Sequence, residues 1–375
     1  MTRRRVLFIV PSLRRAGAEN QVVQLVNGLD PERYEKHLVF YLPDDELRAK
    51  IDEDNVTVHA FPRSKKIDMH VTARIAALID AARIEIVHCT LENALLYGAM
   101  ASFRASRNPA LICALHTTKH IGWKHIAADA MIHRHLLRNC EQVWFMSEIQ
   151  ASIWIRRMKF LGSRSAIVHN GIDSDAFSRS DFIQSGHQLR EEYGIPGDAR
   201  VLCCIAGFRP VKLHAVMLRA MRQLKDVGAG RYYLLLAGSG PLEPALRRQV
   251  TELSLENAVF FLGEVADVRP VLAAADCKLL VSEAETFSMA MLEAMAMELP
   301  VIATSVGGSG EAIQDGETGY LVSPGDADDL VARIRDVFAS AEQREAMGRR
   351  ARKAVVDRFS RSRMIATSSE LLDRL

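Results

Sequence analysis

The sequence has little of what marks a secreted, membrane-spanning or nucleic-acid-binding protein. Aromatic residues make up only 6% of its 375 residues, and no stripe of lysine and arginine is interleaved with them, which argues against a nucleic-acid-binding surface. No apolar run approaches the roughly 18 residues needed to cross a bilayer, and the opening MTRRRVLFIVPSLRR returns to arginine too early for a signal peptide. We therefore expect a cytoplasmic protein that binds no nucleic acid.

Cysteine and metal-ligand patterns are also sparse. The six cysteines show no C-x-x-C spacing and lie mostly within apolar stretches, so we expect reduced core residues rather than disulfides or a zinc site. The two D-x-D-like segments, PDDE (43–46) and GDADD (325–329), are typical of turns or helix starts. The sequence therefore predicts no metal and no bound cofactor.

The length and the hydrophobic pattern predict two α/β domains, because a chain this long is comfortable for two cores. Twelve short apolar runs alternate with amphipathic segments, which is typical of parallel strands covered on both faces. The runs occupy residues 6–10, 37–42, 56–61, 84–89, 110–115, 142–146 and 165–170, and then 201–207, 232–238, 258–263, 276–282 and 300–305. We predict two Rossmann-like, doubly wound domains that enclose a cleft and bind ligands beyond the carboxyl ends of their strands.

Two further segments complete the predicted domain organisation. A polar stretch at about 172–198, rich in Ser, Asp and Gly, is interpreted as the linker between the domains. The last residues, from about 342 to 375, show helical patterns rich in arginine and no further strand. They must therefore pack outside the second sheet.

Residues that follow the predicted strands are candidates for phosphate contacts. Gly17 follows the first strand, and AGSGP (237–241) follows another, but neither segment has the G-x-G-x-x-G pattern of an NAD-dependent oxidoreductase. A structural turn is the simpler interpretation of AGSGP and an equal alternative for Gly17. Arg209 and Lys212 in GFRPVK follow the first strand of the second domain, where paired cations can neutralise a leaving diphosphate. A solvated helix start is the alternative there.

The segment EAETFSMAMLEAMAMELP (283–300) combines four glutamates with many Met and Ala residues, which are typical of a helix packed in a hydrophobic core. Ser288 suits a helix N-cap, so the free N–H groups of the first turn would face phosphate. A carboxylate can accept two hydrogen bonds from a diol, which makes Glu293 a candidate ribose contact and Glu285 a candidate sugar contact. Solvated surface acids are the alternative, and the segment's other two glutamates are interpreted in that way.

Histidines gather between residues 115 and 140. Only His116 directly follows a predicted strand, where it can donate a hydrogen bond to a bound sugar or diphosphate. The other four fit the polar face of a helix: His120, His125, His133 and His135. No helical H-E-x-x-H accompanies them, so zinc is not predicted.

Taken in order, these segments resemble the family-4 retaining glycosyltransferases of GT-B fold, and the resemblance covers nearly the whole chain. The matching segments are GAE (17–19), HNGID (169–173), GFRPVK (207–212), FLGEV (261–265), the E-x7-E element (285–293) and PVIATSVGGSGEAI (300–313). The resemblance implies an acceptor-side domain at 1–175, joined by a C-terminal helix at about 358–375 that crosses back to it. It also implies a nucleotide-sugar-binding domain at 176–357.

The resemblance also implies roles for individual residues. Those implied in donor binding are Gly17, Arg209, Lys212, Glu264, Val265, Glu285, Thr286, Phe287, Ser288, Met289, Ala290 and Glu293, and those implied in catalysis are His116, Arg209, Lys212 and Glu285. The donor sugar would be held by Glu285 and the backbone that follows it, and the diphosphate by the two cations and the helix start. Glu293 would hold the ribose, and the backbone of Glu264 and Val265 would frame the base.

The expected activity is transfer of a hexose from a nucleotide diphosphate sugar, UDP-linked, with retention of configuration and without a metal. The expected acceptor is a saccharide or lipid-linked saccharide in cell-surface polysaccharide synthesis. A nucleotide-sugar epimerase or hydrolase on the same fold, and a non-catalytic nucleotide-sugar-binding subunit, are the alternatives. The basic stretch IWIRRMKFLGSR (153–164), with Trp154, Ile155 and Phe160, suggests peripheral contact with the inner face of an anionic membrane, against the alternative of an ordinary helix with a solvated basic side.

Overall fold

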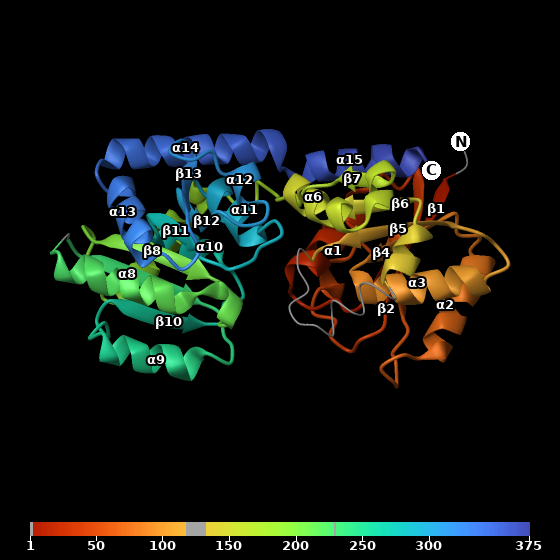
Figure 1. Cartoon of the computed structure of the whole chain (residues 1–375), viewed down its shortest axis with the longest axis horizontal. Coiled ribbons are helices and arrows are strands. Elements are labelled where there is room, and N and C mark those ends of the chain that lie inside the picture. The colour runs from red at the N-terminus through yellow and green to blue at the C-terminus, as the bar shows by residue number, and fades with distance from the viewer. Residues whose placement is uncertain (1–2, 118–132, 229) are drawn as a thin grey trace. The chain divides into compact units, whose positions relative to one another are not determined.

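The computed structural model describes residues 3–117, 133–228 and 230–375. The chain divides into two compact units, Met1–Gly171 with Arg361–Leu375 (unit 1) and Ile172–Ser360 (unit 2) (Figure 1). Each unit holds one sheet in which every strand pair is parallel, with helices on both faces. The predicted pair of doubly wound α/β sheets is confirmed.

Unit 1 has a seven-stranded sheet in the order β3-β2-β1-β4-β5-β6-β7. Its strands are β1 Arg4–Val10, β2 Tyr34–Phe40, β3 Val56–Ala60, β4 Ile86–Thr90, β5 Ala110–Leu115, β6 Gln142–Phe145 and β7 Ser165–Ile167. The strand order reverses between β1 and β4, so the crevice for a ligand in such a sheet lies beyond the carboxyl ends of these two strands.

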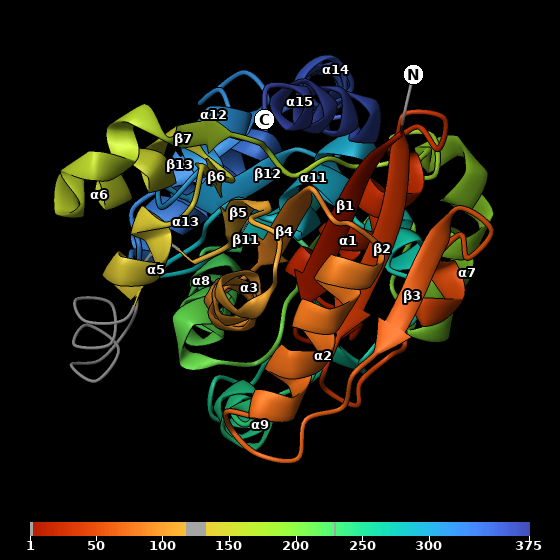
Figure 2. The same cartoon turned by 90° about the vertical axis from the view of Figure 1, so that its right-hand side faces the viewer.

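Helices cover both faces of the first sheet. They are α1 Gly17–Gly28, η1 Arg48–Lys50, α2 Met69–Ala81, α3 Glu92–Arg104, α5 Arg134–Arg138, α6 Glu148–Arg157, η3 Lys159–Ser163 and α15 Arg361–Asp373. Figure 2 shows α2 and α3 in front of the strands. The last helix, α15, packs beside α1 and is anchored where Tyr34 Oη donates to Asp373 Oδ1 at 2.6 Å. It therefore packs outside the second sheet, as predicted.

Unit 2 has a six-stranded sheet in the order β10-β9-β8-β11-β12-β13. Its strands are β8 Arg200–Ile205, β9 Tyr232–Ala237, β10 Val259–Gly263, β11 Cys277–Leu280, β12 Val301–Thr304 and β13 Gly319–Val322. The order reverses between β8 and β11. The edge strand β13 was not among the predicted strands; it has only four residues, two of them half-buried, and so lacks a long apolar run.

The helices of unit 2 include one that corrects the predicted linker. They are η4 Arg179–Phe182, α7 Ile183–Glu192, η5 Pro210–Lys212, α8 His214–Asp226, α9 Glu243–Glu252, α10 Arg269–Ala274, α11 Met289–Ala296, α12 Ser309–Ala312, α13 Ala327–Val337 and α14 Ala341–Arg358. Helix α7 lies within the stretch interpreted as a linker and packs on α10. Its sequence is polar because only Gly186 is buried, and a Cβ there would lie 2.7 Å from the backbone of Ala273.

Other local predictions can be compared with the structure. All six cysteines are buried and free, as predicted. The segment GDADD is a helix start, because the Asp326 side chain accepts hydrogen bonds from the N–H groups of Asp328 and Asp329 at the start of α13. Within the described part of the chain, no helix is long and apolar enough to cross a membrane.

Candidate functional site

The two strands that flank the reversal in unit 2 bring the predicted cations and carboxylate together. The loop after β8 is tied to the loop after β11 by the hydrogen bond from Glu283 N to Val211 O, at 2.8 Å. Across this contact Lys212 Nζ forms an ion pair with Glu285 Oε1, which also accepts a hydrogen bond from Ser282 Oγ at 3.0 Å. The two paired side chains are only 24% and 12% exposed. Lys212 and Glu285 therefore form one preorganised charge pair at the switch point.

Arg209 does not join this pair. Its side chain is exposed, and it stands at the N-cap of η5, the short helix that ends at Lys212. The sequence pattern assigns both cations to the diphosphate, whereas the structure pairs Lys212 with Glu285 and leaves Arg209 exposed to solvent.

Helix α11 begins where it was predicted to begin. Ser288 is its N-cap, and Ser288 Oγ accepts a hydrogen bond from Met291 N at 3.3 Å. Met289 and Ala290 form the half-buried first turn of α11, where backbone N–H groups lie ahead of the i to i−4 hydrogen-bond pattern of the helix. The N-terminus thus offers backbone donors and the positive end of the helix dipole at the same edge as Lys212.

The loop before α11 is held from two sides. Phe287 is 4% exposed and packs on Phe359, with ring centroids 5.1 Å apart. The backbone of Thr286 accepts a hydrogen bond from Gly308 N at 2.8 Å. Gly307 has a φ of +54°, and a Cβ there would lie 1.8 Å from Glu285 O, so the loop after β12 can approach this closely only with glycine.

One turn into α11, Glu293 interacts electrostatically with a buried lysine, Lys278, that the sequence did not single out. Burial raises the pKa of Glu293, and the positive charge of Lys278 acts in the opposite direction. Lys278 is fully buried on β11, and its Nζ has no hydrogen-bond partner among the described residues. A lysine inside the otherwise apolar strand CKLL was the available signal.

The loops after β8, β9 and β10 are joined into one surface. The AGSGP loop contacts the loop after β8 where Ser239 O accepts from Phe208 N at 2.8 Å. Gly240 has a φ of +156°, and a Cβ there would lie 2.6 Å from Phe208 O, which accounts for the glycine by packing. Ser239 Oγ donates a hydrogen bond to the carboxylate of Glu264. The next residue, Val265, is half-buried. The side chain of Glu264 is thus held in place, in addition to its predicted backbone role.

In unit 1 the glycine loop is fixed by a buried acid. Gly17 is exposed at the start of α1, and two residues later Glu19 is 2% exposed. Arg14 Nε donates to Glu19 Oε1 at 3.0 Å. In addition, Gln21 exchanges two hydrogen bonds with the backbone of Gly171, at 3.0 and 2.9 Å, and so connects α1 to the HNGID segment. Sequence spacing gave no sign of this connection.

His116 follows β5, as predicted, and faces a small cavity of about 30 Å³ lined also by His88 and Thr90. Burial lowers the pKa of His116 to about 4 and that of His88 to about 3. Both rings are therefore neutral near pH 7, and His116 can serve as a hydrogen-bond donor or acceptor rather than as a cation. His120 and His125 lie outside the described residues.

The apolar part of the predicted membrane contact is wrong. Trp154 is fully buried in the core of unit 1, and its Nε1 donates to Thr117 O at 3.0 Å. Ile155 and Phe160 are partly buried against the same core. The side chains left at the surface of this stretch are mainly basic: Arg156, Arg157 and Lys159.

Comparison with known proteins assigns the family. The profile "Glycosyltransferase Family 4" matches residues 15–176, and the profile "Glycosyl transferases group 1" matches residues 187–354. The chain belongs to the group 1, family 4 glycosyltransferases. In the described part of this glycosyltransferase, no group of three or more His, Cys, Asp or Glu side chains is placed to hold a metal ion.

Three relatives illustrate the similarity. N-acetyl-α-D-glucosaminyl L-malate synthase of Bacillus anthracis is 36% identical over 53% of this chain and 51% of its own length, so the match spans about half of each protein. The GDP-mannose-dependent α-(1-6)-phosphatidylinositol monomannoside mannosyltransferase of Mycolicibacterium smegmatis is 27% identical over 80% of each chain. Anabaena HepE, solved in complex with UDP-glucose, superposes with a TM-score of 0.85 at 22% identity, over 99% of this glycosyltransferase and 100% of HepE. This structural match shows the GT-B fold.

Proposed function

We propose that this glycosyltransferase moves a hexose from a UDP-sugar to a saccharide or lipid-linked saccharide, with retention of configuration. The observation that carries the proposal is the Lys212–Glu285 pair at the switch point of unit 2, beside the N-terminus of α11. A cation and a helix start suit a diphosphate, and a carboxylate suits the hydroxyls of a sugar. Glu293 on the same helix would then hold the ribose.

The chemical problem in such a transfer is charge. Negative charge grows on the leaving diphosphate while the sugar becomes oxocarbenium-like, and preorganised donors lower the barrier by meeting that charge where it develops. Lys212, Arg209 and the first-turn amides of α11 would do so. His116, as a neutral ring, would contact the sugar, and the leaving phosphate oxygen would take the proton of the acceptor hydroxyl.

We propose that the donor carries UDP rather than GDP. The structural neighbour HepE was solved with UDP-glucose, whereas the mannosyltransferase relative is named for GDP-mannose. In this chain the loops beside the proposed base site, ending in Glu264 and Val265, would contact the base through backbone atoms. A calorimetric comparison of UDP and GDP binding separates the two, since the wrong base leaves buried polar groups unpaired and binds more weakly.

The proposal is tested by turnover with a panel of nucleotide sugars and cell-derived saccharide acceptors. Nucleotide release is followed for the wild type and for Lys212→Ala, Glu285→Ala and Glu293→Ala. We expect each change to lower turnover by on the order of 10²-fold, as for loss of one charge-stabilising group. Undiminished turnover in all three would overturn the site, and rapid conversion of the donor to an epimer without acceptor would favour an epimerase.

We further propose that any membrane contact of unit 1 is electrostatic and reversible. With Trp154 buried, the stretch at 153–164 offers basic side chains without an inserting aromatic. Such attraction decays within a Debye length and weakens with salt. Sedimentation with anionic liposomes at low and moderate salt tests this, and binding that persists unchanged at moderate salt would contradict it.

A further inference from the structure

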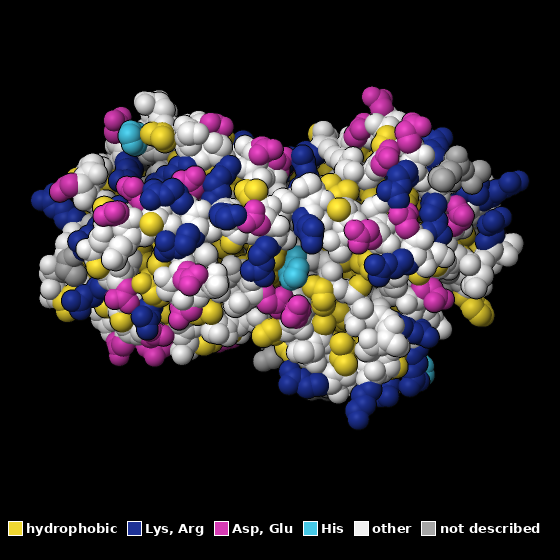
Figure 3. Space-filling view, turned by 90° about the horizontal axis from the view of Figure 1, so that it is seen from above, with side chains coloured by type: hydrophobic (Ala, Val, Ile, Leu, Met, Phe, Trp, Pro, Cys, Tyr) yellow, Lys and Arg dark blue, Asp and Glu magenta, His cyan; other side chains and the backbone are white. Residues whose placement is uncertain are grey.

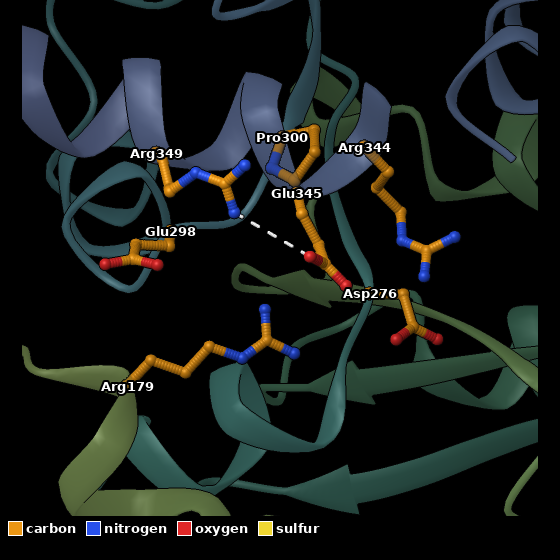
Figure 4. A pocket seen from close by; sticks show the side chains of 7 residues that line it. All are labelled: Arg179, Asp276, Glu298, Pro300, Arg344, Glu345 and Arg349. Carbon is orange, nitrogen blue, oxygen red and sulfur yellow. Dashed lines mark ion pairs between the residues drawn. The ribbon is translucent and has the colours of Figure 1, made fainter. Parts of the chain in front are cut away.

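A second pocket of unit 2 lies at the opposite edge of the sheet from the proposed donor site. Asp276 directly precedes β11 and Pro300 directly precedes β12, so the pocket faces the amino ends of these strands. Its volume is about 350 Å³. Figure 4 shows the lining side chains, which are Arg179, Asp276, Glu298, Pro300, Arg344, Glu345 and Arg349.

The carboxylates of this pocket already have cationic partners. Asp276 accepts from Arg190 Nη2 at 3.0 Å and from Val201 N at 2.8 Å, so both of its oxygens are occupied. Glu345 lies 3.7 Å from Arg349 on the same helix. The last carboxylate, that of Glu298, lies 4.0 Å from Arg352.

Two arginines remain without a carboxylate. Among the residues that the structure describes, none places a carboxylate oxygen within 4.0 Å of the Arg179 or Arg344 guanidinium. Arg179 donates only to the backbone, to Ala275 O at 2.9 Å, and Arg344 lies over the ring of Phe338 at 5.2 Å. Burial lowers the pKa of Arg179, the carboxylate of Asp276 acts in the opposite direction, and the like charge of Arg190 acts in the same direction as burial. An anion between Arg179 and Arg344 would add a direct counter-charge to both guanidinium groups and so offset the cost of burial and of their mutual repulsion.

The shape of the pocket is maintained by tight packing between α14 and the end of α11. Helix α14 carries Arg344, and one turn later Gly348 packs against the turn that follows α11, where a Cβ would lie 2.0 Å from Glu298 O. Arg352, one further turn along, donates to the carbonyl of Ala296 at the last turn of α11. The two elements are thereby fixed together, so the pocket is formed before any ligand arrives.

The exposed face of α14 helps to define the ligand. Figure 3, which views the molecule from the side of α14, shows cationic and anionic side chains interspersed rather than a field of one sign. Such a surface does not favour a long polyanion. A small ligand that presents one anionic group and several hydroxyls matches the mixture better, because guanidinium groups bind phosphate and carboxylates accept hydrogen bonds from hydroxyls.

We propose that this pocket binds a sugar phosphate, with the phosphate between Arg179 and Arg344 and the sugar hydroxyls toward Glu298 and Glu345. The volume is in the range of small-molecule sites, which begin at about 300 Å³. This site is separate from the donor site of the proposed function, because it lies at the other edge of the sheet.

The test is isothermal titration calorimetry of the full chain with glucose 6-phosphate, inorganic phosphate and glucose. We expect glucose 6-phosphate to bind more tightly than inorganic phosphate, and glucose alone not to bind. Arg344→Gln should weaken glucose 6-phosphate by at least about tenfold, the loss expected for one charge-assisted contact. The matched control is Arg350→Gln on the same helix, where Arg350 donates to Glu317 O outside the pocket, and its affinity should equal that of the wild type.

Lys212→Ala separates this pocket from the donor site. Glucose 6-phosphate affinity that survives Lys212→Ala and is lost in Arg344→Gln supports the proposal, whereas the reverse pattern places the ligand at the donor site and overturns it. No binding, or equal binding to wild type and Arg344→Gln, overturns it as well. Arg344 is chosen before Arg179 because Arg179 also holds the Ala275 backbone, so its loss can unfold the unit.

Discussion

The N-terminus of α11 can be tested by changing one side chain in two directions. Ser288 Oγ caps the helix by accepting from Met291 N at 3.3 Å. Ser288→Ala removes the cap and should reduce the free energy of unfolding by about 1 kcal/mol. Ser288→Asp keeps a cap acceptor and adds a negative charge that the helix dipole favours, so stability should be retained.

Donor affinity should respond in the opposite way to stability: Ser288→Asp should weaken it strongly and Ser288→Ala only slightly. If the diphosphate binds at this helix start, we take about 5 Å as the separation between a carboxylate at position 288 and a phosphate charge. At an effective dielectric constant of about 20, two unit charges at that separation repel by about 3 kcal/mol, which is on the order of a 100-fold loss of affinity. Ser288→Ala should change affinity far less, because only backbone atoms of this residue are proposed to contact the donor.

The chain contains a matched control for both variants. Ser340 is the N-cap of α14 in the same unit, and its Oγ accepts from Gln343 N at the same 3.3 Å. Ser340→Ala and Ser340→Asp should reproduce the stability changes without altering UDP affinity. For a unit of this size a 1 kcal/mol loss lowers Tm by about 2 to 4 °C, which differential scanning calorimetry resolves. Unchanged UDP affinity in Ser288→Asp would refute a phosphate site at α11.

Two further predictions concern residues that the fold buries. Lys278→Met removes the positive charge that lowers the pKa of Glu293, so the Glu293 carboxylate should gain its proton at a higher pH than in the wild type. When UDP affinity is measured from about pH 8 down to about pH 5, the affinity of the variant should therefore begin to fall at a higher pH than that of the wild type. An unshifted profile would contradict the proposed electrostatic effect of Lys278 on Glu293. Gly348→Ala places a methyl 2.0 Å from Glu298 O and should destabilise the protein by about 1 to 3 kcal/mol in urea unfolding; Gly310→Ala, which meets only an ordinary contact at 3.7 Å, should stay within about 1 kcal/mol, and equal effects would contradict the packing.

Most of the fold could be predicted because buried parallel strands carry their signal locally. The buried run VLFIV of β1 and the strand β5 are apolar throughout, which is typical of a sheet covered on both faces. The two elements that escaped prediction lack that signal. β13 is a short edge strand, and α7 packs through the backbone at Gly186, so its side chains remain polar. In both cases tertiary packing, rather than hydrophobic periodicity, decides the structure.

The candidate site divides in the same way. The N-cap at Ser288 could be predicted, because a cap and its helix are neighbours in sequence. The partner of Lys212 could not, because Glu285 lies 73 residues away, and only the parallel order β8-β11 makes their loops adjacent. For the same reason the bridge from Gln21 to Gly171, 150 residues apart, left no trace in the spacing of the motifs.

The pairing of Lys212 with Glu285 has a consequence for the proposed reaction. In this structure each residue partly neutralises the other in a half-buried position, so the charges do not stand unpaired at the site. In the proposed reaction a UDP-sugar would offer phosphate to Lys212 and hydroxyls to Glu285, and so would replace both partners at once. UDP alone would engage the lysine without offering sugar hydroxyls to the carboxylate, which keeps its hydrogen bond from Ser282 Oγ, so UDP should bind less tightly than the intact donor. The Lys212–Glu285 pair would then re-form as UDP departs, so the arrangement proposed to hold the intact donor would also favour release of the nucleotide after transfer.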